Sequence, residues 1–339
     1  MWMCSSFVED PPWLQNARPG KIDRIGFGLL ILWIGCLQIV LDKGQTEDWF
    51  SSRLIVWLSL VAVATFAIFL IWELRVAQPI VNLRVFKDRN LAIGALLLFL
   101  VGAVLYGTTA VLPLFMQNLL GWTATTAGLV MSPRGFGAIA GSIVAARILA
   151  SHKIDGRAWI AFGFVVLAWS MFVLGQASDQ SDIRHLITPI IISGFGVTTI
   201  FVPMTTYSMA TVSRDQMGDA TGLTSLLRNL GGSVGISVFT TFIARGSQTH
   251  QALLVGHLSP YEPAFASRLE MLGNALGGAT NPDAIRRATA VLYRILEGQS
   301  VLWAYVEQFR LLVIVCLACA PLVFLFKKPV HSGPAPMSH

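Results

Sequence analysis

Charged residues are scarce in this chain. Asp, Glu, Lys and Arg together make up 12% of its 339 residues, whereas soluble domains carry about 25%. Hydrophobic residues reach 54%, and one water-facing core cannot hide so much apolar surface, so lipid must cover much of it. The net charge of +6 does not indicate a nucleic-acid-binding protein, because the basic residues are not gathered into one patch.

Motifs for several kinds of chemistry are also missing. No G-x-x-x-x-G-K-[ST] sequence occurs, so no ATP site is recognisable. The four cysteines form no disulfide framework, and Cys316-x-x-Cys319 has no second pair or histidine beside it. No predicted span carries a central acid, and no metal cluster or nucleophile–base set lies at membrane depth. We therefore expect neither an enzyme nor a bound cofactor or metal.

The chain instead contains eight apolar stretches, and a span needs about 17–25 apolar residues. They predict an all-α membrane protein with eight transmembrane helices. The stretches are Ile25–Leu41, Leu54–Trp72, Leu91–Met116, Ala124–Ala146, Trp159–Leu174, Ile187–Ala210, Leu223–Ala244 and Ala304–Phe326.

Lys and Arg are distributed unevenly between the connections of these spans. Alternate connections and the two ends carry thirteen, whereas the opposite short connections hold only Lys43, Arg53 and Arg184. Because basic residues stay on the cytoplasmic side, both termini are predicted to be cytoplasmic in a multi-pass cell (inner) membrane protein. No cleavable signal peptide is visible, since the first eight residues lack a basic region.

Two segments outside the spans are informative. Residues 1–24 contain Pro-Pro and Pro-Gly pairs with scattered charges and are predicted to be a cytoplasmic linker, and residues 327–339 a cytoplasmic tail. Residues 245–303 form a long extracytoplasmic loop, in which Asn281-Pro282-Asp283 predicts the start of an amphipathic helix against the outer surface. This helix is either a solvated cover or a docking surface for a partner protein.

Two arginines lie inside predicted spans. Arg134 stands ten residues into the fourth span, about 15 Å deep, and beside it Pro133 removes a backbone donor and loosens the helix. Its role is either structural, paired with carbonyl dipoles, or coupling to a substrate or proton. Arg228, in the seventh span, either snorkels to the membrane surface or takes part at an interface.

Small residues cluster in the same span. Gly231-Gly232-Ser233-Val234-Gly235 matches the nucleophile elbow G-x-S-x-G, but that motif needs a strand–turn–helix, and here it lies in an apolar helix. We therefore predict that Gly231, Gly232 and Gly235 permit close helix packing.

Taken in order, these motifs resemble the 14-span drug:proton antiporters of the major facilitator superfamily. Gly121-Trp-Thr-Ala-Thr-Thr-Ala-Gly128 and Ser132-Pro-Arg-Gly135 are similar to the entry and middle of that family's tenth span. Ala220-Thr-Gly-Leu223 and Leu227-Arg-Asn-Leu-Gly-Gly-Ser-Val-Gly235 resemble its thirteenth. The resemblance covers essentially the whole chain, and the run from Arg228 to Gly235 is its most specific part.

The resemblance implies a division of the chain. Residues 25–90 are the pair of helices inserted between two six-helix halves, and residues 91–326 are the C-terminal six-helix domain. The third and sixth spans then line the cavity, with Gly194, Gly196 and Pro203 able to relax the backbone, while Pro133, Arg134 and Arg228 lie at the domain interface or couple it. The implied cavity residues are Tyr106, Thr108, Thr109, Thr198 and Thr199.

A loop between the fourth and fifth spans resembles the superfamily's cytoplasmic gate motif. Lys153, Asp155 and Arg157 fit the tail of that motif, but Ser151 and His152 stand where an acid is usual.

The resemblance implies export of hydrophobic, often cationic drugs, driven by the proton gradient. The family's N-terminal six spans and their membrane acid are missing from this sequence. Because two repeats must rock around one site, we expect the chain to need that half or a homodimer partner. A periplasmic adaptor is an implied partner. The alternative is a truncated, non-transporting remnant or an assembly scaffold.

Overall fold

The computed structural model describes residues 23–151, 155–178, 183–213, 216–256, 258–259, 261–278 and 281–327. These residues form helices joined by turns, with no strand among them, and eight helical segments are long and apolar enough to cross a membrane, as predicted. The α-helices are α3 Arg24–Lys43, α4 Arg53–Arg75, α5 Arg89–Asn118, α6 Ala124–Met131, α7 Arg134–Ser151, α8 Gly156–Leu174, α9 Ile183–Met209, α10 Met217–Val255, α11 Pro263–Ala275 and α12 Pro282–Leu322. Short 3-10 helices are η1 Trp49–Ser51, η2 Leu83–Lys87 and η4 Val323–Leu325.

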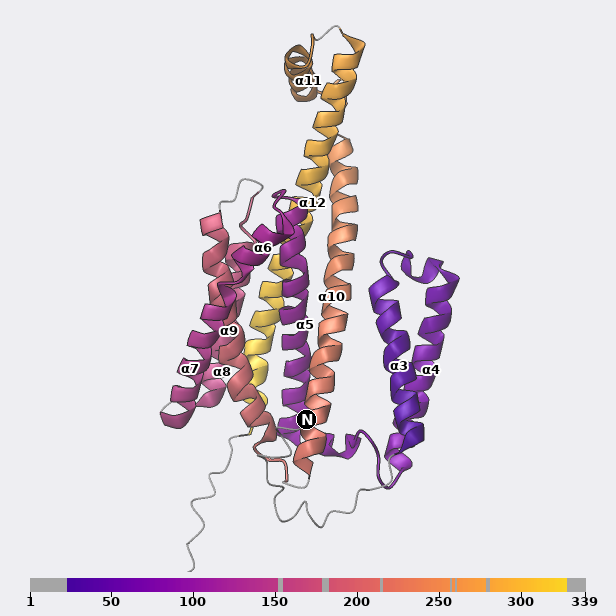
Figure 1. Ribbon diagram of the computed structural model, residues 1–339, viewed down its shortest axis with the longest axis vertical. Coiled ribbons are helices and arrows are strands. Elements are labelled where there is room, and N and C mark those ends of the chain that lie inside the picture. The colour runs from indigo at the N-terminus through magenta and orange to yellow at the C-terminus, as the bar shows by residue number, and fades with distance from the viewer. Residues whose placement is uncertain are drawn as a thin grey trace, which may run out of the picture.

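Helices α3 and α4 form a hairpin beside the main bundle (Figure 1). The Asp23 carboxylate caps α3 by accepting hydrogen bonds from the amides of Ile25 and Gly26, and it also accepts one from the Trp72 indole of α4 at 2.8 Å. The Gly26 amide bond, with those from Trp72 and Ile25, lowers the pKa of Asp23 against the opposing effect of desolvation. One carboxylate therefore both caps α3 and ties the hairpin together.

The other membrane helices form a two-layer bundle. In the first layer, α7 packs on α9, α9 on α5, and α5 on α10 (Figure 1). In the second layer, α8 and α12 pack against each other and cover α9 and α10 from behind. The core between the layers is mainly aliphatic and contains an aromatic cluster in which the Phe115 ring meets Tyr305 and Phe309 of α12 edge-on. The first layer thus keeps one open side, which we call the front face.

Glycines set the spacing within the first layer. A Cβ added at Gly231 would lie 2.0 Å from the Phe99 carbonyl oxygen, and one at Gly235 would lie 2.5 Å from the Ala103 Cα. From the other side, a Cβ at Gly102 would lie 2.2 Å from the Arg228 carbonyl oxygen. Only glycine lets the α5 and α10 backbones approach this closely.

The fourth predicted span is divided into two helices. Helix α6 ends at Met131 and α7 begins at Arg134, with Ser132 and Pro133 between them. Pro133 has no amide proton to donate and its ring clashes with the preceding turn, so a single straight helix does not form here.

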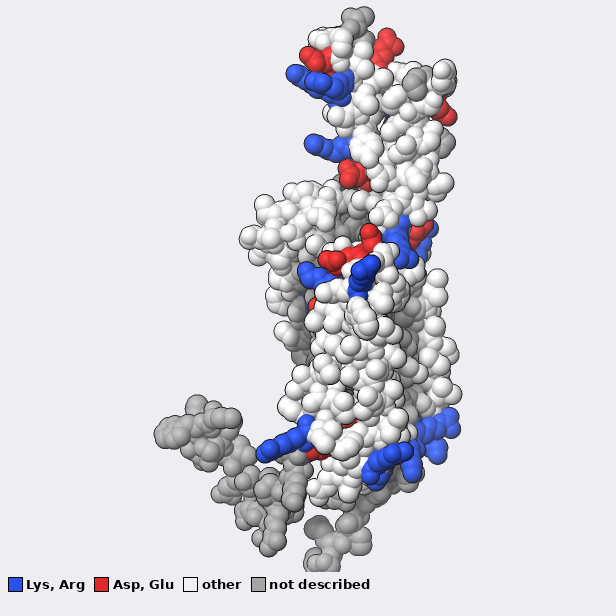
Figure 2. All heavy atoms as spheres, turned by 90° about the vertical axis from the view of Figure 1, so that its right-hand side faces the viewer, with Lys and Arg blue, Asp and Glu red and all other residues white. Residues whose placement is uncertain are grey.

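Below the projecting ends of α10 and α12, charged side chains gather at two levels of the molecule (Figure 2). One level is at its lower end, and the other is where α10 and α12 leave the bundle; the surface between them is white in this view. A belt without charge between two charged rims is the pattern expected of a protein surrounded by lipid.

The segment 245–303 departs from its prediction. A helix does begin at Pro282, capped by the Asn281 side chain, but it continues without a break into the last span. With the extension of α10 and with α11, it forms a projection that rises away from the bundle (Figure 1). The expected helix lying against the outer surface was wrong, because Ala288 and Leu292 are buried within the projection itself.

Polar contacts join the two long helices of the projection at its base. The Gln251 side-chain amide donates to the Tyr293 hydroxyl at 2.6 Å, and His250 Nε2 lies 3.1 Å from a Glu307 carboxylate oxygen. These two contacts tie α10 to α12.

Two glycines of α10 provide a matched test of the packing. Gly235→Ala should destabilise the protein by about 1–3 kcal/mol, because its methyl group overlaps the α5 backbone. Gly222 has no atom within 4 Å of its ideal Cβ position, so Gly222→Ala should stabilise by about 0.5–1 kcal/mol through helix propensity. Thermal unfolding in detergent micelles, followed by circular dichroism, measures both. Equal effects of the two substitutions would contradict the close-packing account.

Candidate functional site

The front face carries two of the predicted cavity residues, and a third lies at the contact of α7 with α9. Tyr106 and Thr109 of α5 are partly exposed there, and the Tyr106 ring packs on Gly232 of α10. Thr198 is half-buried, and its hydroxyl lies beside Gly141 of α7. A hollow of about 240 Å³ adjoins Tyr106 and is also lined by Asn229 and Ser233. Hydroxyl and amide groups are therefore presented on an otherwise apolar surface.

Two other predicted cavity residues do not lie on this face. Thr108 is 2% exposed, and its hydroxyl donates to the Val104 carbonyl oxygen and lies 3.9 Å from the Met171 sulfur of α8. Thr199 is fully buried, and its methyl group lies beside Gly163 of α8. Both side chains point into the core between the layers, so neither contacts a ligand on the front face.

Arg134 joins two helices of the first layer. Its Nη1 donates to the Thr109 hydroxyl of α5 at 2.8 Å, although Arg134 belongs to α7. The Arg134 carbonyl oxygen packs where Gly194 of α9 has no side chain, since a Cβ there would lie 2.1 Å away. Gly194 therefore lets α7 come close enough to α9 for Arg134 to reach across to α5.

Arg228 points across the bundle. It stands eleven residues after Met217, the first residue of α10, which is about 16 Å along the helix. Its guanidinium carbon lies 5.3 Å from the centre of the Phe201 ring of α9, a cation–π contact. The Arg228 side chain thus packs against a neighbouring helix of the bundle.

The residues expected to relax the sixth span lie within one continuous helix. Helix α9 runs unbroken from Ile183 to Met209 and includes Pro203. Gly194 packs against Arg134, and a Cβ at Gly196 would lie 3.2 Å from the Leu167 backbone nitrogen of α8. In this structure the two glycines are sites of close helix contact.

Comparison with known proteins agrees with this architecture. Residues 46–236, more than half of the chain, match the Major Facilitator Superfamily. The chain belongs to this superfamily.

Several of its relatives are named for drug or fatty acid resistance. The chain is 32% identical over 317 residues to the "Multidrug export protein EmrB" of Escherichia coli (strain K12), and 32% identical over 314 residues to the "Fatty acid resistance protein FarB" of Neisseria gonorrhoeae. Each alignment covers 92% of this chain and 60% of the relative. "Multidrug resistance protein 3" of Bacillus subtilis is 29% identical over 327 residues, with 93% and 60% covered. The chain thus spans about three fifths of the length of these relatives.

The loop that resembles the superfamily's gate motif has a local structural role. Asp155 caps α8 by accepting a hydrogen bond from the Arg157 amide and forms an ion pair with the Arg157 guanidinium at 3.0 Å. Arg157 Nη1 also donates to the Phe326 carbonyl oxygen at 3.0 Å, which ties α8 to the end of η4. Lys153 lies outside the described residues.

Sequence reasoning missed two residues that complete this end of the bundle. Asn90, 1% exposed at the start of α5, donates to the Lys327 carbonyl oxygen at 3.1 Å and accepts from the Lys327 amide at 2.7 Å. The Tyr207 hydroxyl of α9 accepts a hydrogen bond from the Gly156 amide at 3.1 Å. These pairs join residues far apart in the chain, and no local sequence pattern predicts such contacts.

Asn90→Ala should destabilise the protein by about 1–3 kcal/mol, because it leaves the backbone groups of Lys327 without partners. Asn229→Ala is the control, since Asn229 is exposed on the front face and should change stability by less than about 0.5 kcal/mol. Denaturant unfolding in detergent micelles measures both variants. A loss in Asn90→Ala no larger than in the control would show that the Lys327 contact does not stabilise the fold.

Proposed function

We propose that the chain is the C-terminal part of a multidrug efflux transporter that exports hydrophobic compounds in exchange for protons. The front face is the single observation that supports this most directly. It combines a largely apolar surface with the hydroxyls of Tyr106 and Thr109, and loosely selective sites are mostly apolar with a few polar groups. The names of the relatives point in the same direction.

The proposed transport needs a second repeat opposite the front face. Facilitators expose their site alternately by rocking two repeats against each other, and the first layer with Arg134 and Arg228 is the side available for that contact. We propose that an N-terminal six-helix half, in the same polypeptide or as a separate chain, supplies the second repeat and the proton-carrying group. A homodimer is the other way to provide a second repeat.

The projection is the proposed contact for a periplasmic adaptor protein, because it extends beyond the bundle at the end opposite Asp23 and Lys327. We propose that both termini lie in the cytoplasm, on the side of the membrane opposite the projection. A non-transporting remnant or assembly scaffold is the alternative to be tested against transport.

Transport is tested in cells that lack their own efflux pumps. The chain, expressed with the N-terminal half of a relative, should lower the accumulation of a hydrophobic dye, and a protonophore should abolish that effect. Tyr106→Leu should reduce dye efflux several-fold, because a hydroxyl is lost from the cavity wall. Trp57→Leu should not, since Trp57 is 69% exposed on α4, in the hairpin beside the bundle.

The alternative of a non-transporting remnant or scaffold is favoured if both halves are present in the membrane and dye efflux does not change. If efflux persists with the protonophore, the proposed proton coupling is contradicted, but the proposed drug export is not.

Orientation is tested by labelling single cysteines in intact cells, with Cys4 replaced by serine because the described cysteines Cys36, Cys316 and Cys319 are buried. Thr46→Cys lies exposed in the α3–α4 connection, and Lys87→Cys lies exposed at the other end of the bundle. A membrane-impermeant maleimide should label Thr46→Cys from outside and Lys87→Cys only after lysis. The reverse pattern would place the termini outside.

A further inference from the structure

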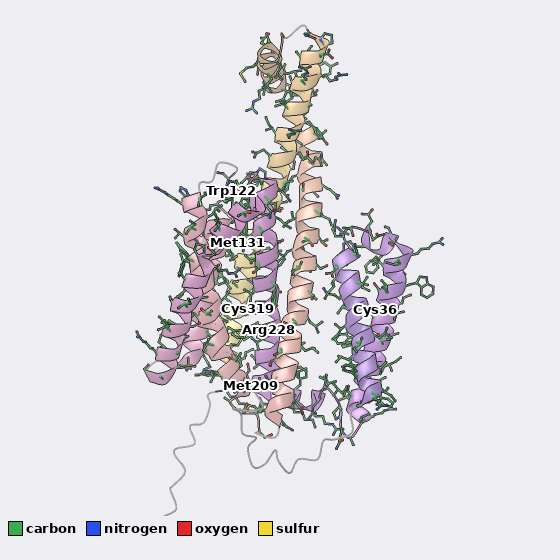
Figure 3. All side chains as sticks on the ribbon, in the orientation of Figure 1. Cys36, Trp122, Met131, Met209, Arg228 and Cys319 are labelled. Carbon is green, nitrogen blue, oxygen red and sulfur yellow. The ribbon has the colours of Figure 1, made fainter. Side chains whose placement is uncertain are left out.

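A cavity of about 240 Å³ lies between α5, α9 and α10 near Arg228. Figure 3 labels two of its residues and shows Arg228 nearer the middle of the bundle and Met209 nearer the end of α9. Its walls combine apolar side chains, hydroxyls and one cation. The lining residues are Leu98, Phe201, Thr205, Met209, Thr221, Thr224, Ser225 and Arg228.

The cation in this cavity has no anion. Among the described residues Arg228 makes no hydrogen bond or ion pair, its Nε is buried without a partner, and its one electrostatic contact is the Phe201 ring. None of the lining residues is acidic. A guanidinium at membrane depth is costly and normally faces a counter-charge or a water-filled cavity, so the vacant space beside Arg228 suits a negatively charged group.

The hydroxyls around Arg228 are not equivalent. Thr205, Thr221 and Thr224 already donate to carbonyl oxygens of their own helices. Ser225 makes no hydrogen bond among the described residues, and it stands three residues before Arg228, hence on the same side of α10. The Ser225 hydroxyl and the Arg228 guanidinium are therefore the two donors available to one anion.

We propose that Arg228 and Ser225 bind the acidic head group of an amphipathic ligand, with a carboxylate as the matching chemistry. A guanidinium presents two parallel N–H groups to a carboxylate, and Leu98, Phe201 and Met209 provide apolar contact for the adjoining carbons. The assignment of such acids as substrates rests on the proposed export function, whereas their binding does not.

The volume limits how much of the ligand enters. Drug-sized molecules occupy pockets of about 300–1,000 Å³, so a cavity of about 240 Å³ holds a head group and a short apolar stem. The remainder of a larger ligand extends onto the front face beside it.

The test measures binding of radiolabelled octanoate to the chain in phosphatidylcholine nanodiscs, with empty nanodiscs subtracted. Octanoate should bind about tenfold more tightly than octanamide, its neutral isostere, because only the acid forms charge-assisted bonds. Arg228→Gln should weaken octanoate binding about tenfold and leave octanamide unchanged, Arg228→Lys should keep part of the affinity, and Ser225→Ala should cost about two- to fivefold. Arg286→Gln, an exposed site on the projection, should change nothing.

Equal affinities for octanoate and octanamide in the unmodified chain would overturn the proposal even if Arg228→Gln failed to fold. An unchanged octanoate affinity in folded Arg228→Gln would overturn it too, and would indicate that Arg228 instead meets a carboxylate of another protein segment. Adding phosphatidylglycerol identifies the source of the anion: competition with octanoate would identify lipid as an occupant of the same anion site, and its absence would leave the soluble acid. If octanoate binds as expected but no dye efflux is seen, the proposed export function is refuted and the proposed anion site is not.

Discussion

The close approach of neighbouring helices at glycines is the constraint on which the rest of this structure depends. Lipid tails are as apolar as the side chains, so helices in a bilayer associate through direct packing and not through the hydrophobic effect. Gly102, Gly231 and Gly235 bring α5 and α10 into backbone contact, and Gly194 does the same for α7 and α9. The flat first layer, and therefore the front face, follows from these contacts.

Once that layer is formed, helical periodicity decides which side chains reach the front. Tyr106 and Thr109 are three residues apart and share one side of α5, whereas Thr108 points toward α8. The sequence contained enough information to separate these residues, because 3.6 residues per turn place Thr108 about 200° from Tyr106. The resemblance implied all three as cavity residues, and the direction of each side chain separates Thr108 from the other two.

Other features depended on contacts that no local pattern encodes. The eight spans and the start of a helix at Pro282 follow from apolar runs and capping residues, which act within a few positions of the chain. That the helix continues into the last span depends on α10 and α11 covering its apolar stripe beyond the bundle. Likewise, the Asn90–Lys327 pair joins residues 237 positions apart.

Arg134 and Arg228, both half-buried, differ in how far the other described residues balance their charge. Arg134 has a hydroxyl from a neighbouring helix, which orients its dipole toward the cation. Among the described residues Arg228 has only the aromatic face of Phe201, and a cation–π contact is worth about 0.5–2 kcal/mol. The Arg228 charge lies on the front face, beside the cavity that opens between α5, α9 and α10. A negative group bound at that position would therefore stabilise this helix layer.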